Sequence, residues 1–369
     1  MTNIEIKHSA QHAHGTVLQV ACVDEAQVAQ SSGVFTLTES AFGKRTVKTM
    51  LAGGIGTPVE YRRGGNVRKM FEYMHAYAAE QGVGVALLHP FSFSYYRQFG
   101  YERVADHAFA RFPTSKIDFV PRRCRFVAYS EEKLPDMLAI YHAFAKGRNL
   151  LLPRVNGASY TAPGRMTYLC YDGTEPIAYV VCSGSKTLRV NHYTDTVLTV
   201  HEMAFVNADA LREIFSFLRM FEGEFDEIVL CDLGVYPEAD MLLKHYTHTV
   251  YHSIPDLAAR VLNTERMLSA HEYPNKAGAF TVRVNDTMPS VAGTFRVCYG
   301  GGEVRVERLA DDAVADVTLP ETALVQLLYG YLPLDARSLA YPDGVEVQGD
   351  CEDLLRAFPR KPGGIFEHF

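Results

Sequence analysis

The spacing of apolar residues changes period along the first hundred positions, which predicts alternating strands and a helix. Residues 16–24 (TVLQVACVD) and 34–38 (VFTLT) are rich in β-branched residues between polar turns, so we expect strands there. A third strand is predicted from about Thr46 to Thr57, ending in the glycine-rich sequence GGIGT. Apolar side chains then recur at helical spacing at Val67, Met70, Phe71, Met74 and Ala78. This pattern predicts a helix that stops near Gly82, before the buried strand VGVALLHPF.

Two further blocks of elements follow. The second has a helical stretch after Pro135, strand-like runs such as IAYVVCS and VLTVHEMAFV, a helix from about Asp209 to Glu222, and the strand EIVLCD. The third alternates short strands with helical stretches near 320–330 and 350–358 and ends in GGIFEHF. The pair Tyr273-Pro274 marks the boundary between them. The predicted fold class is α+β with mixed α/β sheets.

Length and composition narrow the class of protein. A chain of 369 residues exceeds one ordinary core, and 47% hydrophobic with 21% charged residues is typical of folded globular domains. The formal net charge of −7 argues against a general nucleic-acid-binding role. Seven scattered cysteines form no CxxC pair, which favours reduced thiols in the cytosol. No secretory signal core or membrane-spanning run is evident, so we expect a cytoplasmic protein without nucleic-acid or membrane partners.

Two histidine patterns raise the possibility of a metal site. His245, His248 and His252 lie close together in KHYTHTVYHS, but their spacing matches no ligand set, and a half-exposed strand or loop is the preferred interpretation. His201-Glu202 begins like a zincin helix, but Phe205 stands where the second histidine belongs. The sequence therefore predicts no metal.

The segment GGIGTPVEYRRGGNVRKM has the ingredients of a pyrophosphate cradle. Gly64 and Gly65 let a backbone approach phosphates closely, and Arg62, Arg63 and Arg68 add positive charge. The N-terminus of the helix that follows supplies unpaired N–H groups. Taken alone, a Gly-Gly turn before a helix is most often only a turn.

Two motifs together resemble a known family. From Arg62 the chain is similar to the acyl-CoA loop of the GNAT acetyltransferases, with Gly65 as its central glycine and Val67 in place of the usual final small residue. HPFSFSYYRQFGYE (His89 to Glu102) resembles the signature of the Eis-like (enhanced intracellular survival) branch, in which a tyrosine precedes an RxFGY-type turn. Residues 187–222 resemble the central domain of that branch. The last hundred residues, with the terminal IFEHF, resemble its sterol-carrier-protein-like domain.

The resemblance implies a domain order and an activity. It implies a GNAT domain over 1–128, a GNAT-like domain over 129–272 and a sterol-carrier-like domain over 273–369, packed closely and assembled as a homo-oligomer (trimer or hexamer). The implied activity is acetyl-CoA-dependent N-acetylation of a primary amine on a small-molecule or peptidyl acceptor, such as an aminoglycoside-like compound, a polyamine or a lysine. The acetyl-CoA contacts it implies are Ile55, Gly56, Thr57, Arg63, Gly64, Gly65, Asn66, Val67, Arg68, Phe91 and Ser92.

The resemblance also implies the catalytic groups. Tyr96 is the implied general acid, and a phenol with a pKa of about 10 remains protonated at neutral pH. The implied general base is the C-terminal carboxylate of Phe369, whose ordinary pKa of about 3.3–3.7 requires desolvation or proton transfer through water. The apolar Ile365 and Phe366 could anchor this terminus. Without the resemblance, the tyrosines would be a packed aromatic cluster and the tail an ordinary chain end.

One region departs from the family pattern. Eis-like proteins usually have one or two helices, walling the substrate cleft, before the segment aligned here from Thr16, and no convincing helix pair occurs in the first fifteen residues. Either the reading frame starts earlier, or part of the wall has been lost. The alternative function is therefore a non-catalytic CoA- or lipid-binding protein.

Overall fold

The chain folds into two compact units. The computed structural model describes residues 2–12, 14–118, 120–158, 160–188, 194–331, 339, 341–367 and 369. The first unit comprises Met1–Ala105, Asp256–Lys361 and Glu367–Phe369, and the second comprises Asp106–Pro255 and Pro362–Phe366. No helix of the described residues is long and apolar enough to cross a membrane.

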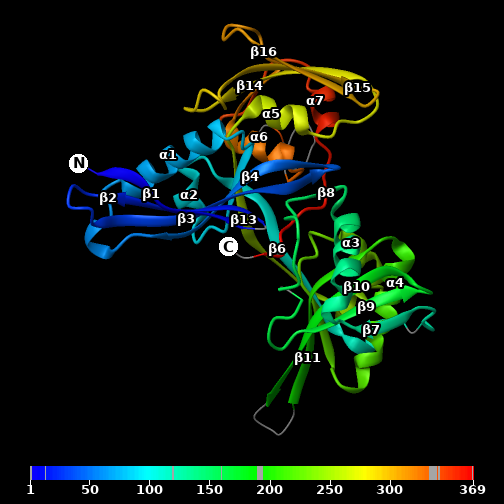
Figure 1. Ribbon diagram of the computed structural model, residues 1–369. Helices are drawn as coiled ribbons and strands as arrows, with labels where there is room; N and C mark the ends of the chain where they lie inside the picture. The colour runs from blue at the N-terminus through cyan, green and yellow to red at the C-terminus, as the bar shows by residue number, and fades with distance from the viewer. Residues whose placement is uncertain are drawn as a thin grey trace. The chain divides into compact units, whose positions relative to one another are not determined.

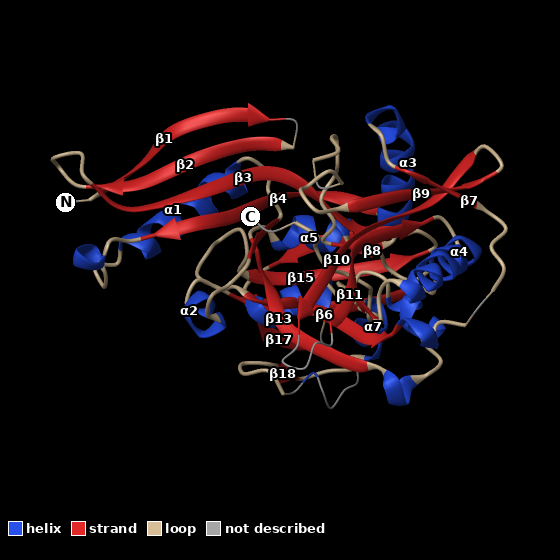
Figure 2. Ribbon diagram, turned by 90° about the horizontal axis from the view of Figure 1, so that it is seen from below, coloured by secondary structure: helices blue, strands red, loops and turns tan. Residues whose placement is uncertain are grey.

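A mixed sheet forms the first half of the first unit. Strands β1 (Asn3–His12), β2 (Gly15–Val23), β3 (Ala29–Gly43) and β4 (Arg45–Gly56) follow one another as an antiparallel series (Figure 2). The short strand β5 (Val85–Leu88) then pairs parallel to β4. The end of β13 (Val250–Val261) pairs antiparallel to β5, with Ala258 opposite Leu88. Two segments about 170 residues apart in the sequence thus become neighbouring strands.

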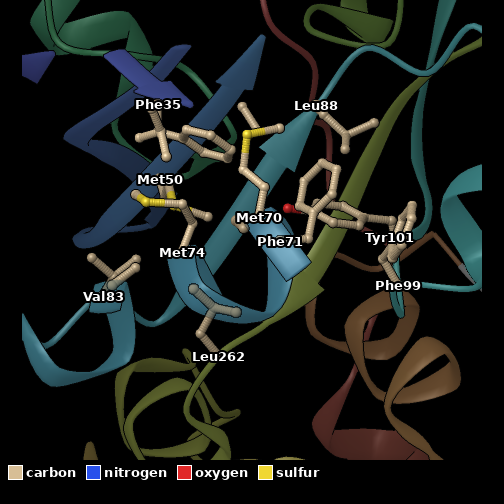
Figure 3. Close-up of a cluster of buried hydrophobic side chains, with 14 of the residues drawn as sticks. Phe35, Met50, Met70, Phe71, Met74, Val83, Leu88, Phe99, Tyr101 and Leu262 are labelled. Atoms are coloured by element: carbon tan, nitrogen blue, oxygen red, sulfur yellow. The ribbon is translucent and has the colours of Figure 1, made fainter. Parts of the chain in front are cut away.

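Helix α1 (Asn66–Glu80) covers this sheet with its apolar face. Met70, Phe71, Met74 and Ala78 recur at helical spacing, and none of the four is exposed. They pack with Phe35 and other sheet residues in one cluster (Figure 3). Burying each of the larger side chains contributes about 1.5–3 kcal/mol. The core therefore fixes the helix whose N-terminus follows the glycine-rich loop.

A second sheet completes the first unit. Its strand order is β16-β15-β14-β17-β18, and three short helices pack against it (Figure 1). The strands are β14 (Gly278–Asn285), β15 (Gly293–Gly300), β16 (Glu303–Leu309), β17 (Val317–Pro320) and β18 (Glu346–Val347). The helices are α5 (Thr264–Ala270), α6 (Glu321–Leu328) and α7 (Glu352–Ala357).

In the second unit, a run of paired strands is flanked by two helices. The strand order within it is β6-β12-β11-β10-β9-β7. These strands are β6 (Glu102–Pro113, which begins in the first unit), β7 (Arg125–Ala128), β9 (Met166–Asp172), β10 (Glu175–Leu188), β11 (Thr194–Phe205) and β12 (Glu227–Leu230). Helices α3 (Leu134–Ala145) and α4 (Ala208–Arg219) pack on β10 and β11, and the two-residue strand β8 is Arg148–Asn149.

Residues Pro362–Phe366, close to the chain end, belong to this second unit and are held in it by several contacts. The Asn149 N–H donates to the carbonyl of Pro362 at 3.1 Å, and the Gly364 N–H donates to the carbonyl of Asn149 at 3.3 Å. The Gly363 N–H donates to the carbonyl of Gly234 at 3.0 Å. The guanidinium of Arg154 lies 5.7 Å from the Phe366 ring centre, so this stretch is anchored by both backbone and side-chain contacts.

The structure confirms the predicted α+β class with mixed sheets, and every strand and helix predicted for the first block is present. Among the elements that the sequence patterns did not reveal are β1, α2 (Phe93–Arg97), β6, β13 and α5. Strand β1 was missed because its residues are mostly polar and half-exposed. No helix lies between β1 and β2 in the described part of the chain.

The histidine segment lies in the second unit. His248 ends a short 3-10 helix, Tyr246–His248, and His252 lies in β13, where its ring stacks on Phe109 at 4.9 Å. Searched over the described residues only, the structure contains no group of three or more His, Cys, Asp and Glu side chains that could hold a metal ion.

Candidate active site

The glycine-rich segment forms a loop that delivers the chain to the N-terminus of α1. After β4 ends at Gly56, a 3-10 helix covers Val59–Tyr61, and the chain then enters left-handed backbone conformations. Gly65 has a φ of 76°, and a Cβ added there would meet nothing within 4 Å, so it is the backbone conformation that calls for glycine. Arg63 has a φ of 64°, which costs a non-glycine residue about 1–3 kcal/mol. Strain held next to a helix N-terminus is typical of a functional loop.

The N-terminus of α1 is suited to bind an anion. Gly65 is the capping residue, no side chain caps the helix, and its first turn carries no acidic residue. The first N–H groups of a helix lack intrahelical partners and lie at the positive end of the helix dipole. Arg62 and Arg63 are exposed beside them. The positive potential and the free donors together favour phosphate groups.

Two polar side chains on α1 are fixed by residues from elsewhere in the unit. Asn66 is buried, and its amide donates to Gln30 Oε1 at 3.1 Å. Arg68 donates through Nη2 to Gln98 Oε1 at 2.8 Å, and its guanidinium lies 5.3 Å from the Phe99 ring centre. Arg68 therefore connects α1 to the turn after α2 and is held in place by these contacts.

A cavity of about 620 Å³ lies over this loop, a size typical of small-molecule sites. Most of the residues predicted to contact acetyl-CoA line it. They are Ile55, Thr57, Arg63, Gly64, Gly65, Asn66, Val67, Arg68 and Phe91. Gly56 and Ser92 are not in its lining, although each is adjacent in sequence to a residue that is. Six lining residues were absent from the predicted contacts: Ser31, Tyr61, Arg62, Tyr95, Gln98 and Phe99.

Of these six, four were within reach of sequence reasoning. Arg62 begins the loop motif, and Tyr95, Gln98 and Phe99 belong to the tyrosine signature, so only Ser31 and Tyr61 stood outside both patterns. Ser31 comes from β3, and its hydroxyl lies 2.8 Å from that of Thr57. No short-range pattern could have assigned Ser31, because pairing of β3 with β4 brings it to the loop.

The paired strands β4 and β5 separate beside the cavity. Their pairing covers Thr49 to Leu51 on β4 and Val85 to Leu87 on β5. Strand β4 continues to Gly56 paired only with β3 over this stretch. Its last residues thus offer backbone groups toward the side where β5 has ended, which suits hydrogen bonding to an extended amide-containing chain.

Tyr96 is part of a dense aromatic cluster. It lies in α2, and the hydroxyl of the capping residue Ser92 accepts a hydrogen bond from the Tyr95 N–H at 3.3 Å. Ring centres of Tyr96 lie 5.2 Å from Tyr95, 5.5 Å from Phe91 and 6.0 Å from Phe71. Phe91 and Tyr95 line the cavity, whereas Tyr96, only 5% exposed, is not in its lining.

Burial controls the ionisation of these phenols. It raises the pKa of Tyr96 to about 12, with a smaller contribution from neighbouring Tyr95. Burial also raises the pKa of Tyr95, against the opposing effect of Arg68. Behind them, the Tyr101 hydroxyl lies 3.0 Å from His75 Nε2, and burial lowers the pKa of that histidine. Tyr95 and Tyr96 are both protonated at neutral pH and can donate a proton.

The chain end lies against β4. A Cβ added to Gly53 would lie 2.7 Å from the carboxyl carbon of Phe369 and 2.9 Å from its oxygen. The Phe369 ring lies 4.8 Å from that of His89, at the end of β5. Strands β4 and β5 thus receive the terminal residue and also lead into the cavity loop and α2. In sequence, Gly53 is two residues before the cavity residue Ile55, and His89 is two before Phe91.

The comparisons with known proteins agree with this geometry. Residues 11–104 match the family model described as an acetyltransferase (GNAT) domain, and they contain the loop, the cavity and the tyrosine cluster. This stretch is a GNAT acetyltransferase domain. The prediction of an acetyltransferase enzyme is thereby confirmed. No curated protein matches the chain in sequence.

Several solved structures share the fold over nearly the whole chain. One is a GCN5-related N-acetyltransferase from Anabaena variabilis, with a TM-score of 0.82, 18% identity and coverage of 95% of this chain and 89% of that one. Eis1 from Mycobacterium abscessus has a TM-score of 0.79, 16% identity and coverage of 100% of both chains. A probable N-acyltransferase of unknown function from Enterococcus faecalis has a TM-score of 0.78, 17% identity and coverage of 96% and 89%. At these identities the likeness shows the fold.

Proposed function

We propose that this protein transfers the acetyl group of acetyl-CoA directly to a primary amine, with Tyr96 as general acid and the Phe369 carboxylate as general base. The observation that carries the proposal is the meeting, in one unit, of the cradle loop, the tyrosine cluster and the chain end. The GNAT domain supplies the reaction class, and the three features supply the groups that the chemistry needs.

The cradle suits the acyl donor. The uncapped N-terminus of α1, with Arg63 and Arg68, would hold the pyrophosphate. The backbone of Ile55, Gly56 and Thr57, on the unpaired side of β4, would bind the pantetheine amides and polarise the thioester carbonyl.

The reaction needs one proton donor and one proton acceptor. The amine nitrogen attacks the acetyl carbon, a C–N bond forms, and the C–S bond breaks as the tetrahedral intermediate collapses. The Tyr96 hydroxyl gives its proton to the departing thiolate, a role compatible with a pKa of about 12. The Phe369 carboxylate steers the ammonium form of the acceptor and takes its proton, directly or through water. The carboxylate then releases that proton to solvent. The second nitrogen proton, lost as the intermediate collapses, returns to the Tyr96 phenolate, so the net products are the amide, the CoA thiol and one proton.

The finer features belong to the same proposal. The acceptor is a cationic amine: an aminoglycoside-like compound, a polyamine or a lysine side chain. Residues 1–128, 129–272 and 273–369 are proposed as GNAT, GNAT-like and sterol-carrier-like domains of a cytoplasmic homo-oligomer. The resemblance of the terminal residues, together with the position of Phe369 beside Gly53, supports the role of the chain end in catalysis.

The test is free-thiol release from acetyl-CoA by the purified full chain, across a panel of polyamines, aminoglycosides and lysine peptides. Amine-dependent release with an acetylated product establishes the reaction. Acetyl-CoA binding without release under any amine would instead favour the alternative, a non-catalytic CoA-binding protein.

Two substitutions then separate the candidate acids. Tyr96→Phe should lower kcat by about 10²-fold or more, a typical loss for a general acid, with unchanged thermal unfolding. Tyr95→Phe is the matched control, because Tyr95 adjoins Tyr96 in the same helix and lines the cavity. A large loss of kcat in Tyr95→Phe, with little in Tyr96→Phe, would reassign the acid to Tyr95.

A further inference from the structure

His89 bridges a strand of the GNAT domain and the last residues of the chain. Its Nδ1 lies 3.2 Å from Asp256 Oδ1, and its Nε2 lies 3.2 Å from the main-chain oxygen of Glu367. Its ring packs on that of Phe369 with centres 4.8 Å apart. The His89 side chain is 16% exposed and that of Asp256 is 24% exposed, so both are largely shielded from water.

Asp256 and Glu367 both offer oxygen atoms to the His89 ring. The Glu367 carbonyl can only accept a hydrogen bond, and an ionised Asp256 carboxylate can also only accept. A neutral imidazole has one N–H and satisfies only one of two acceptors. The ring therefore joins Asp256 and Glu367 whichever of its two nitrogens carries the proton.

Strand pairing explains why this pair forms. Asp256 begins the part of β13 that lies in the first unit, and Ala258 two residues later is opposite Leu88, the last residue of β5. The residue following Leu88 is thus brought next to Asp256. The Glu367 carbonyl, 278 residues after His89 in the sequence, also lies at this histidine.

We propose that His89 and Asp256 form a clamp that positions the C-terminal carboxylate for catalysis. His89 holds Glu367 by its carbonyl and supports the Phe369 ring, and Asp256 fixes the orientation of the imidazole. This confines the last residue so that its carboxyl group lies over Gly53. The clamp acts through the tail and not on the substrate, so both residues are positioning residues. The inference rests on the proposed role of the Phe369 carboxylate.

Carboxypeptidase A provides a direct measurement of the clamp, because it releases a C-terminal phenylalanine only from an accessible chain end. His89→Phe keeps a ring beside Phe369 but cannot donate to the Glu367 carbonyl. Loss of this hydrogen bond should raise the rate of Phe369 release by about 10-fold. Asp256→Asn retains a polar partner for Nδ1 and should give a smaller increase.

Steady-state kinetics provide the second measurement. A displacement of the base of about 1 Å costs on the order of 10²-fold, so His89→Phe should lower kcat by at least about 10-fold. The KM for acetyl-CoA should stay within about twofold, since the cradle is untouched. In a chain lacking Phe369, His89→Phe should cause no further loss. This non-additivity would not arise from general destabilisation.

A matched His–Asp pair in the second unit serves as control. His107 Nδ1 lies 2.7 Å from Asp232 Oδ1, and His107→Phe should leave both Phe369 release and kcat unchanged. If His89→Phe proves unstable in a thermal melt, His89→Leu, which also has no hydrogen-bond donor, replaces it.

The outcomes separate this inference from the proposed function. Unchanged Phe369 release and unchanged kcat in His89→Phe overturn the clamp. Faster Phe369 release from His89→Phe, with full kcat both in that variant and in the chain lacking Phe369, supports the clamp but rejects the carboxylate as base. A large kcat loss on deleting Phe369, with wild-type behaviour of His89→Phe, supports the base and rejects the clamp.

Discussion

Gly53→Ala is the sharpest perturbation of the chain end that the structure offers. The added methyl would lie 2.7 Å from the Phe369 carboxyl carbon, whereas ordinary contacts begin near 3.4 Å. The terminus must therefore move by roughly 0.7 Å to restore contact distance, since a chain end yields more easily than paired β4 does. Gly53 has no positive φ, so alanine fits its backbone conformation. The perturbation thus displaces the carboxylate while leaving the strand in place.

The expected effect is on turnover. Misplacing a catalytic group by about 1 Å costs on the order of 10²-fold, so we expect kcat to fall by about 10- to 100-fold. The free energy of unfolding should change by less than about 1 kcal/mol, because alanine is as compatible with a strand as glycine. The assay is thiol release at saturating acetyl-CoA and amine, alongside urea unfolding. Gly223→Ala, at a position where a Cβ meets nothing within 4 Å, should match wild type in both.

Two results would refute this reasoning. If Gly53→Ala keeps kcat within about twofold of wild type, the position of the carboxylate does not limit the reaction. If Gly53→Ala lowers kcat as strongly in a chain already lacking Phe369, the methyl group acts on something other than the terminal residue.

Three other predictions follow from the same unit. Gly100→Ala should destabilise the fold by about 3 kcal/mol or more in urea melts, because the φ of Gly100 is +82° and an added Cβ would overlap the Arg260 guanidinium. The control Gly147→Ala, at a φ of +85° but with open space around the added Cβ, should cost only about 1 kcal/mol. Burial raises the pKa of Glu321 to about 8, against the opposing effect of Arg260. Between pH of about 4.5 and 8 the native state therefore keeps a proton that the unfolded state has lost, so the free energy of unfolding should fall as the pH rises through this range. In Glu321→Gln, the free energy of unfolding should fall less between pH 5 and pH 8.5 than it does in the wild type. An equal fall in both proteins would show that Glu321 does not cause the pH dependence. Arg68→Ala should raise the KM for acetyl-CoA by about 10-fold with a smaller change in kcat, and an unchanged KM would remove Arg68 from the cradle.

The tight packing around Arg260 gives the Gly100 prediction its physical basis. Arg260 donates to both carboxylate oxygens of Asp286 at 3.0 and 3.1 Å and is only 5% exposed. Displacing it would leave buried charges without their partners, which is among the costliest changes in a protein interior. A Gly100→Ala protein as stable as Gly147→Ala would show that this ion pair yields without loss.

Features governed by neighbours in sequence were predictable. The cradle is one: the left-handed Gly65 and the start of α1 depend on the few residues around them, and GGNVRK displays both. The face of α1 is another, because the 3.6-residue period fixes which side chains share a side. Strands β2 and β4 were also predictable, because their many β-branched residues are a signal carried by neighbouring positions. The polar strand β1 carried no such signal.

What the sequence by itself determined is therefore the α+β class, the loop before α1 and, through its motifs, the acetyltransferase reaction. Only the tertiary structure decided which distant residues meet: Ser31 with Thr57, Arg260 over Gly100, and His89 with Asp256 and Glu367. It also placed Tyr95 in the cavity lining and Tyr96 behind it. The physical reason is that turns and helix ends depend on local backbone conformation. Contacts between residues 167 or 278 positions apart depend on strand order and core packing, which no short segment encodes.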